Sequence, residues 1–194
     1  MSKKNETVLT ITRKKVEEEG ILIGKGVTRK VYELNGKIYK ICYNKADYLD
    51  KFRNECFFWG MDKDIKQNCS TRWSYNSVNS NINEFNLYQE NKDKYNFLNL
   101  TTRRKSNFKI IEQEKIDCNK VVELAEEILD DWYVDDEDIL ELMIEGQLSE
   151  YMDFTFKDVM SFIEENNLAY SEICLVKQWG LNKDGYLRLC DYSR

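Results

Sequence analysis

Two glycines, a lysine and an aspartate occupy the positions at which this chain could do chemistry. Gly24 and Gly26 lie in a turn between strand-like runs, where a backbone without Cβ atoms can approach a phosphate closely. Lys40 follows in a strand-like run, and Asp191 comes directly after another such run. A carboxylate is an oxygen ligand that Mg²⁺ prefers. The same glycines also suit an ordinary hairpin turn, and a lone aspartate also suits a solvated surface.

Composition excludes several other chemistries. The 194-residue chain has no histidine, which excludes an imidazole base, a serine–histidine triad and the common zinc sites. Its six cysteines are scattered without a Cys-x-x-Cys pair, so we expect reduced structural thiols, no zinc and no haem. With 42% hydrophobic and 33% charged residues the chain is globular, and it has no apolar run of a membrane span's length. We expect a cytoplasmic protein that does not bind a membrane.

Charge is distributed unevenly along the chain, whose net charge is −6. Residues 1–53 contain thirteen Lys or Arg against seven acids, whereas residues 121–156 contain thirteen acids and no Lys or Arg. The acidic stretch would repel nucleic acid, and the basic residues are spread over every strand, so we do not expect direct nucleic-acid binding. Such a stretch is typical of solvated helix faces, and it would also suit a basic protein partner or mimic nucleic-acid phosphate.

The elements that must position these residues begin with strands. Short runs rich in β-branched and aromatic residues predict an antiparallel meander of residues 21–23, 30–34 and 37–43. Asn35-Gly36 predicts a type I′ hairpin turn, because both central residues of that turn need a positive φ. Apolar residues at three- and four-residue steps predict a helix over 45–61 that packs on the meander. Residues 1–19 are mostly charged and predict an extension with a short strand or an ordered tail near residues 8–11.

Helices dominate the prediction for the second half of the chain. Residues 62–96 predict a long irregular connection with a short helix near 84–90. Further strands are predicted at 97–102 and 108–113, helices at 121–132, 139–152 and 155–166, and strand-like runs at 173–176 and 186–190 around a turn at 182–185. Thr155 and Asp158 predict a capping box at the start of the last helix. Strands followed by helices indicate an α+β fold.

In combination these features resemble a protein kinase. Gly24 to Val31 resembles the glycine-rich loop G-x-G-x-x-G-x-V, with Arg29 at the third glycine. Lys40 lies where kinases keep the lysine that holds the α and β phosphates of the nucleotide. Glu55, fifteen residues further on in the predicted helix, lies where they keep the carboxylate that pairs with this lysine. A solvated helix acid is the alternative interpretation of Glu55.

The rest of the chain extends the resemblance. Strand 108–113 with Glu114 resembles the segment whose backbone contacts the adenine edge, and Asp191-Tyr192-Ser193 resembles the metal-binding Asp-Phe-Gly motif. Gln178 lies thirteen residues before Asp191, where kinases keep the asparagine for a second Mg²⁺. The resemblance therefore implies ATP and Mg²⁺, bound by Gly24, Gly26, Lys40, Glu55, Glu114 and Gln178, with Asp191 and Gln178 on the metal.

Departures from the kinase pattern indicate lost catalysis. Ile173 stands where kinases keep the aspartate base and cannot accept a proton. Glu172, one residue away, is the only candidate catalytic residue and needs a shifted loop. Only three residues follow Asp191, so an activation segment and most of the lower lobe are missing from the sequence. The resemblance implies a kinase-like α+β fold: an extension (1–19), a five-stranded antiparallel amino-terminal lobe with one packed helix (20–116), and a reduced, mainly helical carboxy-terminal lobe (117–194).

Three functions follow from these features. We favour a pseudokinase-like protein that retains nucleotide affinity and acts mainly by binding a partner protein. An alternative is a phage or mobile-element inhibitor of a host nuclease or defence complex that uses the acidic helical surface. A second alternative is an active, atypical ATP-dependent kinase, in which Glu172 replaces the missing base.

Overall fold

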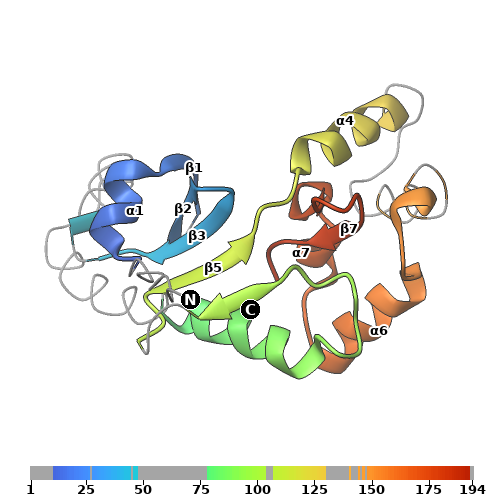
Figure 1. Cartoon of the computed structure of the whole chain (residues 1–194). Helices are drawn as coiled ribbons and strands as arrows, with labels where there is room; N and C mark the ends of the chain where they lie inside the picture. Colours follow the sequence, from blue (N-terminus) through green and yellow to red (C-terminus); the bar gives the residue numbers. More distant parts are fainter. Residues whose placement is uncertain are drawn as a thin grey trace, which may run out of the picture.

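An antiparallel sheet and a group of helices make up this α+β chain (Figure 1). The structure, a computed structural model, describes residues 11–26, 28–44, 46–47, 78–103, 107–129, 140, 144, 146 and 148–192. In Figure 1 the strands of the sheet and α1 (Arg13–Glu19) lie on one side of the molecule, and α4 (Cys118–Leu129), α6 (Phe156–Asn166) and α7 (Tyr170–Ile173) lie on the other. A helix of residues 78–91, drawn in green, extends between the two sides.

Five strands form the main sheet in the order β1-β2-β3-β5-β4, with every neighbouring pair antiparallel. Their bounds are β1 Ile21–Lys25, β2 Arg29–Leu34, β3 Lys37–Cys42, β4 Thr101–Arg103 and β5 Ile110–Glu114. Asn35 and Gly36 have φ angles of 53° and 69°, which confirms the predicted hairpin turn between β2 and β3. The five predicted strands are therefore confirmed, although β4 is shorter than the pattern indicated.

Helix α1 covers part of the sheet and belongs to its core. Thr12 caps the helix by accepting a hydrogen bond from the Lys15 N–H at 3.1 Å. The fully buried Val16 packs with Tyr32, Leu34, Tyr39, Ile41 and Ile110 of the sheet. The sequence analysis did not predict this helix within the extension 1–19, because Val16 is the one apolar side chain among the charged residues 13–19. Residues 1–10 lie outside the described residues.

Asp47 ties α1 to the second strand. Its carboxylate accepts hydrogen bonds from Arg13 of α1 and from Lys30 of β2. Burial alone would raise the pKa of Asp47, but the hydrogen bonds from Lys30, from the backbone at Asn44 and from Arg13 lower it below the ordinary value. The predicted helix over 45–61, including Glu55, falls almost entirely outside the described residues.

The 78–91 helix is longer than the predicted short helix at 84–90 and replaces part of the predicted irregular connection. Its buried positions are Asn81, Glu84, Leu87 and Asn91, which recur at helical spacing. Three of these four residues are polar, so the helix carries no hydrophobic stripe in the sequence. At one end the helix contacts the sheet through Glu84, and at the other Asn91 donates to Asn166 of α6 at 3.1 Å.

A second hydrophobic core lies among the helices. Phe97, Phe162 and Trp179 are fully buried, and Phe97 packs against both other rings with centroids 5.5 and 5.7 Å apart. Helix α6 begins with the predicted capping box, in which Thr155 and Asp158 each satisfy a backbone N–H of the other. The remaining elements here are η1 (Ser149–Tyr151), η2 (Val176–Gln178), β6 (Trp179–Leu181) and β7 (Leu187–Leu189).

The strand-like run predicted at 173–176 is instead helical. Residues 170–173 form α7, and residues 176–178 form the single turn η2. Ile173 and Cys174 are buried, and a short buried apolar run suits a helical turn as well as a strand. The strand actually begins at Trp179, where β6 pairs with β7 across the predicted turn, in which Gly185 has a φ of 83°.

The described part of the chain bears on the predictions about cysteines and membrane spans. Cys42, Cys118, Cys174 and Cys190 are free thiols, as predicted for these four. Among the helices of the described ranges, none is both long enough and apolar enough to cross a membrane. The predicted helix at 139–152 lies largely outside those ranges, apart from its last turn, η1.

Candidate functional site

Lys40 and Glu84 form a buried ion pair between the sheet and the 78–91 helix. The Lys40 Nζ lies 2.5 Å from the Glu84 Oε1, and both residues are almost completely buried. The Lys40 ammonium also donates to the carbonyl oxygen of Cys190 at 2.7 Å and lies 3.6 Å from the Asp191 Oδ1. Lys40 therefore joins β3, the helix and the segment after β7, three parts that are far apart in the sequence.

Arg29 completes this cluster from the start of β2. Its Nη1 donates to Glu84 and, at 3.1 Å, to the Asn81 Oδ1, while its Nη2 donates to the Asp191 Oδ1 at 3.0 Å. Burial alone would lower the pKa of Arg29, but the Glu84 and Asp191 carboxylates raise it above its ordinary value. Two cations and two carboxylates thus form one compensated cluster, which is how buried charges are tolerated.

Neutral hydrogen-bonding groups hold Glu84 from the other side. Gln113 of β5 donates from its Nε2 to the Glu84 Oε1 at 2.6 Å and to the Thr101 Oγ1 at 2.8 Å. The Thr101 hydroxyl is 2.6 Å from the Tyr192 hydroxyl, which in turn donates to the Asn99 carbonyl at 2.9 Å. A polar network therefore connects the charged cluster to Tyr192, the residue after Asp191, and fixes the carboxylate of Glu84 in one orientation.

A cleft of about 510 Å³ lies against this cluster. Gly26, Arg29 and Val31 line it from the turn and β2, Lys40 lines it from β3, and Asp191 lines it from the segment after β7. Glu172, Ile173 and Gln178 line it from α7 and η2. Five residues that the sequence predicted for a site, Gly26, Lys40, Glu172, Gln178 and Asp191, thus share one cleft.

Two other predicted site residues, Gly24 and Glu114, do not line this cleft. Gly24 lies within β1 and does not line it. Glu114 lines a separate hollow of about 480 Å³; its backbone N–H donates to the Leu100 carbonyl at 3.2 Å, and its own carbonyl accepts from Asn99 at 2.9 Å. Its backbone is therefore already hydrogen-bonded within the protein. Glu55 lies outside the described residues.

Glu84 is the carboxylate that the sequence analysis missed. We expected Glu55, which lies outside the described residues, to pair with Lys40; within the described residues Glu84 pairs with it. The available signal was the helical spacing of Asn81, Glu84, Leu87 and Asn91, which a search for apolar periodicity overlooks. Arg29 was interpreted only as a lost glycine, and its long side chain turns out to be the second cation of the cluster.

The groups around Asp191 do not fit a Mg²⁺ site. Its Oδ1 accepts a hydrogen bond from Arg29 and lies near the Lys40 ammonium, so two cations already occupy the surroundings of this carboxylate. Gln178 lines the same cleft and offers a neutral amide. Within the described ranges no three His, Cys, Asp or Glu residues come together as a group. Asp191 and Gln178, the side chains predicted to bind the metal, therefore share one cleft, and two cations of the protein lie near Asp191.

Two thiols lie next to the cluster. Cys118, at the start of α4, contacts Cys190, whose carbonyl oxygen accepts the hydrogen bond from Lys40. The hydrogen bond from Cys190 lowers the pKa of Cys118, whereas the same bond and burial raise the pKa of Cys190. Just before α4, the Asp117 N–H donates to the Leu181 carbonyl of β6 at 2.7 Å. This hydrogen bond holds the segment between β5 and α4 against β6.

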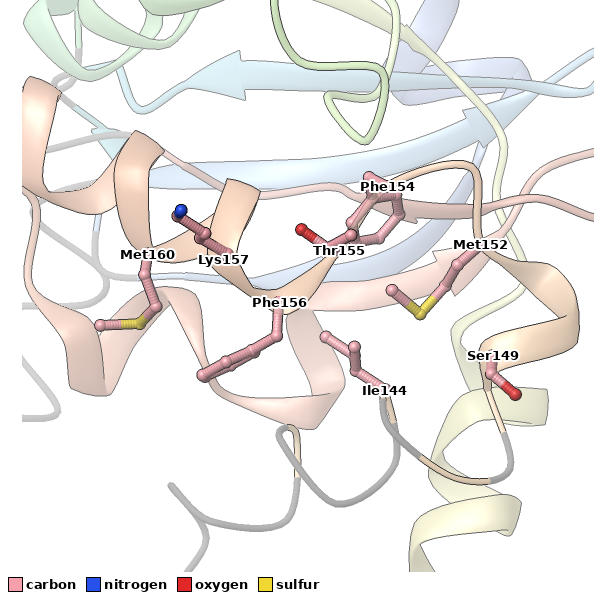
Figure 2. A pocket seen from close by; sticks show the side chains of 8 residues that line it. All are labelled: Ile144, Ser149, Met152, Phe154, Thr155, Phe156, Lys157 and Met160. Carbon is pink, nitrogen blue, oxygen red and sulfur yellow. The ribbon is translucent and has the colours of Figure 1, made fainter.

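A larger hollow of about 600 Å³ lies elsewhere, beside the start of α6 (Figure 2). Ile144, Met152, Phe156 and Met160 line it, and Lys157 is the charged side chain among the described residues of its wall. Figure 2 shows these side chains facing a common space between α6 and the segment before it. Most of the described residues that line this hollow are apolar, whereas charged groups gather at Lys40, so the cleft at Lys40 is the candidate functional site.

Comparisons with models of protein families, with curated proteins and with solved structures find no match to this chain. Its function is therefore argued from the arrangement of its own residues.

Proposed function

We propose that this chain is a kinase-like protein that binds a nucleotide in the cleft at Lys40, does not transfer its phosphate, and acts by binding a partner protein. The observation that carries the proposal is the ion pair of Lys40 and Glu84 next to Asp191 on one cleft. Protein kinases hold the nucleotide phosphates with a lysine on the third strand, keep that lysine aimed with a helical glutamate, and have an aspartate nearby.

The walls of the cleft suit a nucleotide. Gly26 borders it without a side chain, and Val31, Ile173 and Leu175 offer apolar surface on which a base can lie. Lys40 brings a buried cation for the phosphates. The volume falls within the range of roughly 300–1,000 Å³ that is typical of small-molecule sites.

Phosphoryl transfer is disfavoured by the groups around the same cleft. Transfer of this kind depends on positioning and on charge, and a base must come within about 3 Å of the proton it accepts. Ile173 is buried on the cleft wall, and it stands at the sequence position where kinases have that base. Asp191 is paired with Arg29. Glu172 is on the wall too and is the one acid left for the role. Incubation with labelled ATP tests this directly, and self-labelling that Glu172→Gln abolishes would contradict the proposal.

Nucleotide binding can be tested by thermal unfolding with ATP. Ligand at about 100 times its Kd adds about 2.7 kcal/mol of stability, which for a chain of this size raises the Tm by roughly 5–10 °C. Lys40→Ala should abolish this rise. Lys37→Ala is the matched control, because Lys37 lies on the same strand and lines the other hollow. The comparison uses the rise caused by ATP in each variant, so a change in the unliganded Tm does not affect it. No rise in the wild type, or an equal rise in Lys40→Ala, would refute the proposal.

A second candidate function uses the acidic surface. On α4 the side chains of Val121 and Ala125 are buried, whereas Glu123 and Glu126 are exposed, so this helix presents acids outward. No Lys or Arg occurs anywhere in residues 121–156. Such a surface would compete with DNA for the basic cleft of a nuclease. Inhibition of nuclease cleavage that the double variant Glu123→Lys/Glu126→Lys loses would support this function, and inhibition unaffected by that variant would exclude this surface.

A further inference from the structure

Arg29 places its guanidinium beside Asp191, the predicted metal ligand. It stands at the third glycine of the glycine-rich pattern, yet its side chain is 6% exposed because it turns back into the cleft. The guanidinium donates to Asp191 at 3.0 Å and to Asn81 at 3.1 Å, and it pairs with Glu84. Three partners, Asn81, Glu84 and Asp191, thus hold a fixed positive charge beside the predicted metal ligand.

A divalent cation at Asp191 would meet two positive charges. The Asp191 oxygen that Arg29 binds is also 3.6 Å from the Lys40 ammonium. Mg²⁺ on the Asp191 carboxylate would lie close to the Lys40 ammonium and to the guanidinium of Arg29, which stays protonated in proteins. Asp191 therefore serves here to compensate Arg29 and Lys40.

The same cations are suited to phosphate itself. Arg29, Lys40 and Lys177 line the cleft, against Glu172 and Asp191. A guanidinium binds phosphate oxygens with paired, charge-assisted hydrogen bonds, and a lysine contributes a point charge. Arg29 and Lys40 are compensated by Glu84 and Asp191, so a phosphate group would bind by taking the place of these carboxylates, with Lys177 beside them on the wall.

We propose that the cleft binds the nucleotide as a free polyphosphate anion, without a divalent cation, and that Arg29 supplies the positive charge that Mg²⁺ supplies in an active kinase. This inference rests on the proposed function, because it concerns the same cleft and the same ligand. It also gives a reason for an arginine at a position where the glycine-rich loop has no side chain.

Binding of ATP is measured by titration calorimetry in excess EDTA and in excess MgCl₂. The expected Kd values agree to within about threefold, whereas a Kd weakened more than about tenfold by EDTA, equivalent to about 1.4 kcal/mol, would overturn the inference. Binding that occurs only with Mg²⁺ leaves the proposed function standing and refutes this inference alone. Absence of binding in both buffers refutes the proposed function and this inference together.

Two variants test the role of Arg29. Arg29→Gly restores the third glycine and should weaken ATP binding in EDTA more than about tenfold, whereas the matched control Arg29→Lys keeps the charge and most of the affinity. If Arg29→Gly fails to fold, Asp191→Asn is used instead, because it keeps the shape of the side chain. Asp191→Asn should bind ATP in EDTA at least as tightly as the wild type, since a negative charge near the phosphates is removed. Unchanged binding by Arg29→Gly, or binding lost in Asp191→Asn, would contradict the proposal.

Discussion

Replacement of Glu84 by glutamine tests the central ion pair of this structure. Glu84 is fully buried and accepts hydrogen bonds from Lys40, Arg29 and Gln113. Glutamine keeps the volume but removes the charge, so Lys40 and Arg29 are left buried with Asp191 as their carboxylate partner. Breaking a buried ion pair by removing one partner costs about 3–5 kcal/mol. Because the side chain of Asp191 is 39% exposed and still compensates part of the charge, we expect a loss near the lower limit, about 3 kcal/mol.

The loss is measured as the change in the free energy of unfolding by urea, followed by circular dichroism. A loss of about 3 kcal/mol corresponds to a fall in Tm of roughly 6–12 °C for a chain of this size. Glu90→Gln is the matched control, since Glu90 lies on the same helix, is exposed, and undergoes the same change of charge; a surface substitution of this kind changes stability by about 0.5 kcal/mol or less. Equal effects of Glu84→Gln and Glu90→Gln, or a larger effect of Glu55→Gln than of Glu84→Gln, would refute the assignment of Glu84 as the partner of Lys40.

Two further predictions concern contacts outside the cleft. Gly180→Ala should destabilise the protein by about 1–3 kcal/mol in urea unfolding, because an added Cβ would lie 2.9 Å from the backbone of Asp117 and Cys118; Gly24→Ala, whose Cβ would meet only Val31 at 3.8 Å, is the control and should lose much less. Asp47→Asn should lower stability at neutral pH, and the difference from the wild type should persist down to the ordinary aspartate pKa and disappear as the pH falls through the lowered pKa of Asp47. A difference that stays constant into strong acid would contradict the role given to this carboxylate.

Several elements could be predicted because local sequence decides them. The turn at Asn35-Gly36 follows from the tolerance of these two residues for positive φ, and Thr155 with Asp158 begins α6 by capping neighbouring backbone groups. Lys40 within a strand and Asp191 directly after one were correct for the same reason. Each of these features depends on residues only a few positions apart.

Predictions from the sequence failed where the conformation or position of an element depends on how it packs against the rest of the chain. A short apolar run after Tyr170 became a helical turn, because burial and not the pattern selects its conformation. The 78–91 helix was underestimated, since its buried face is mostly polar and gains stability only through partners on the sheet and on α6. Apolar periodicity could therefore not have found Glu84.

The sequence by itself determined the strands, the turn, the capped helix, and the presence of a lysine and an aspartate in the right kinds of element. Only the tertiary structure decided which groups meet. Lys40 and Glu84 are 44 residues apart, and Arg29 and Asp191 are 162 residues apart. The physical reason is that a buried charge must find compensation in space, and any carboxylate that the fold brings within hydrogen-bonding distance provides it, wherever it lies in the chain.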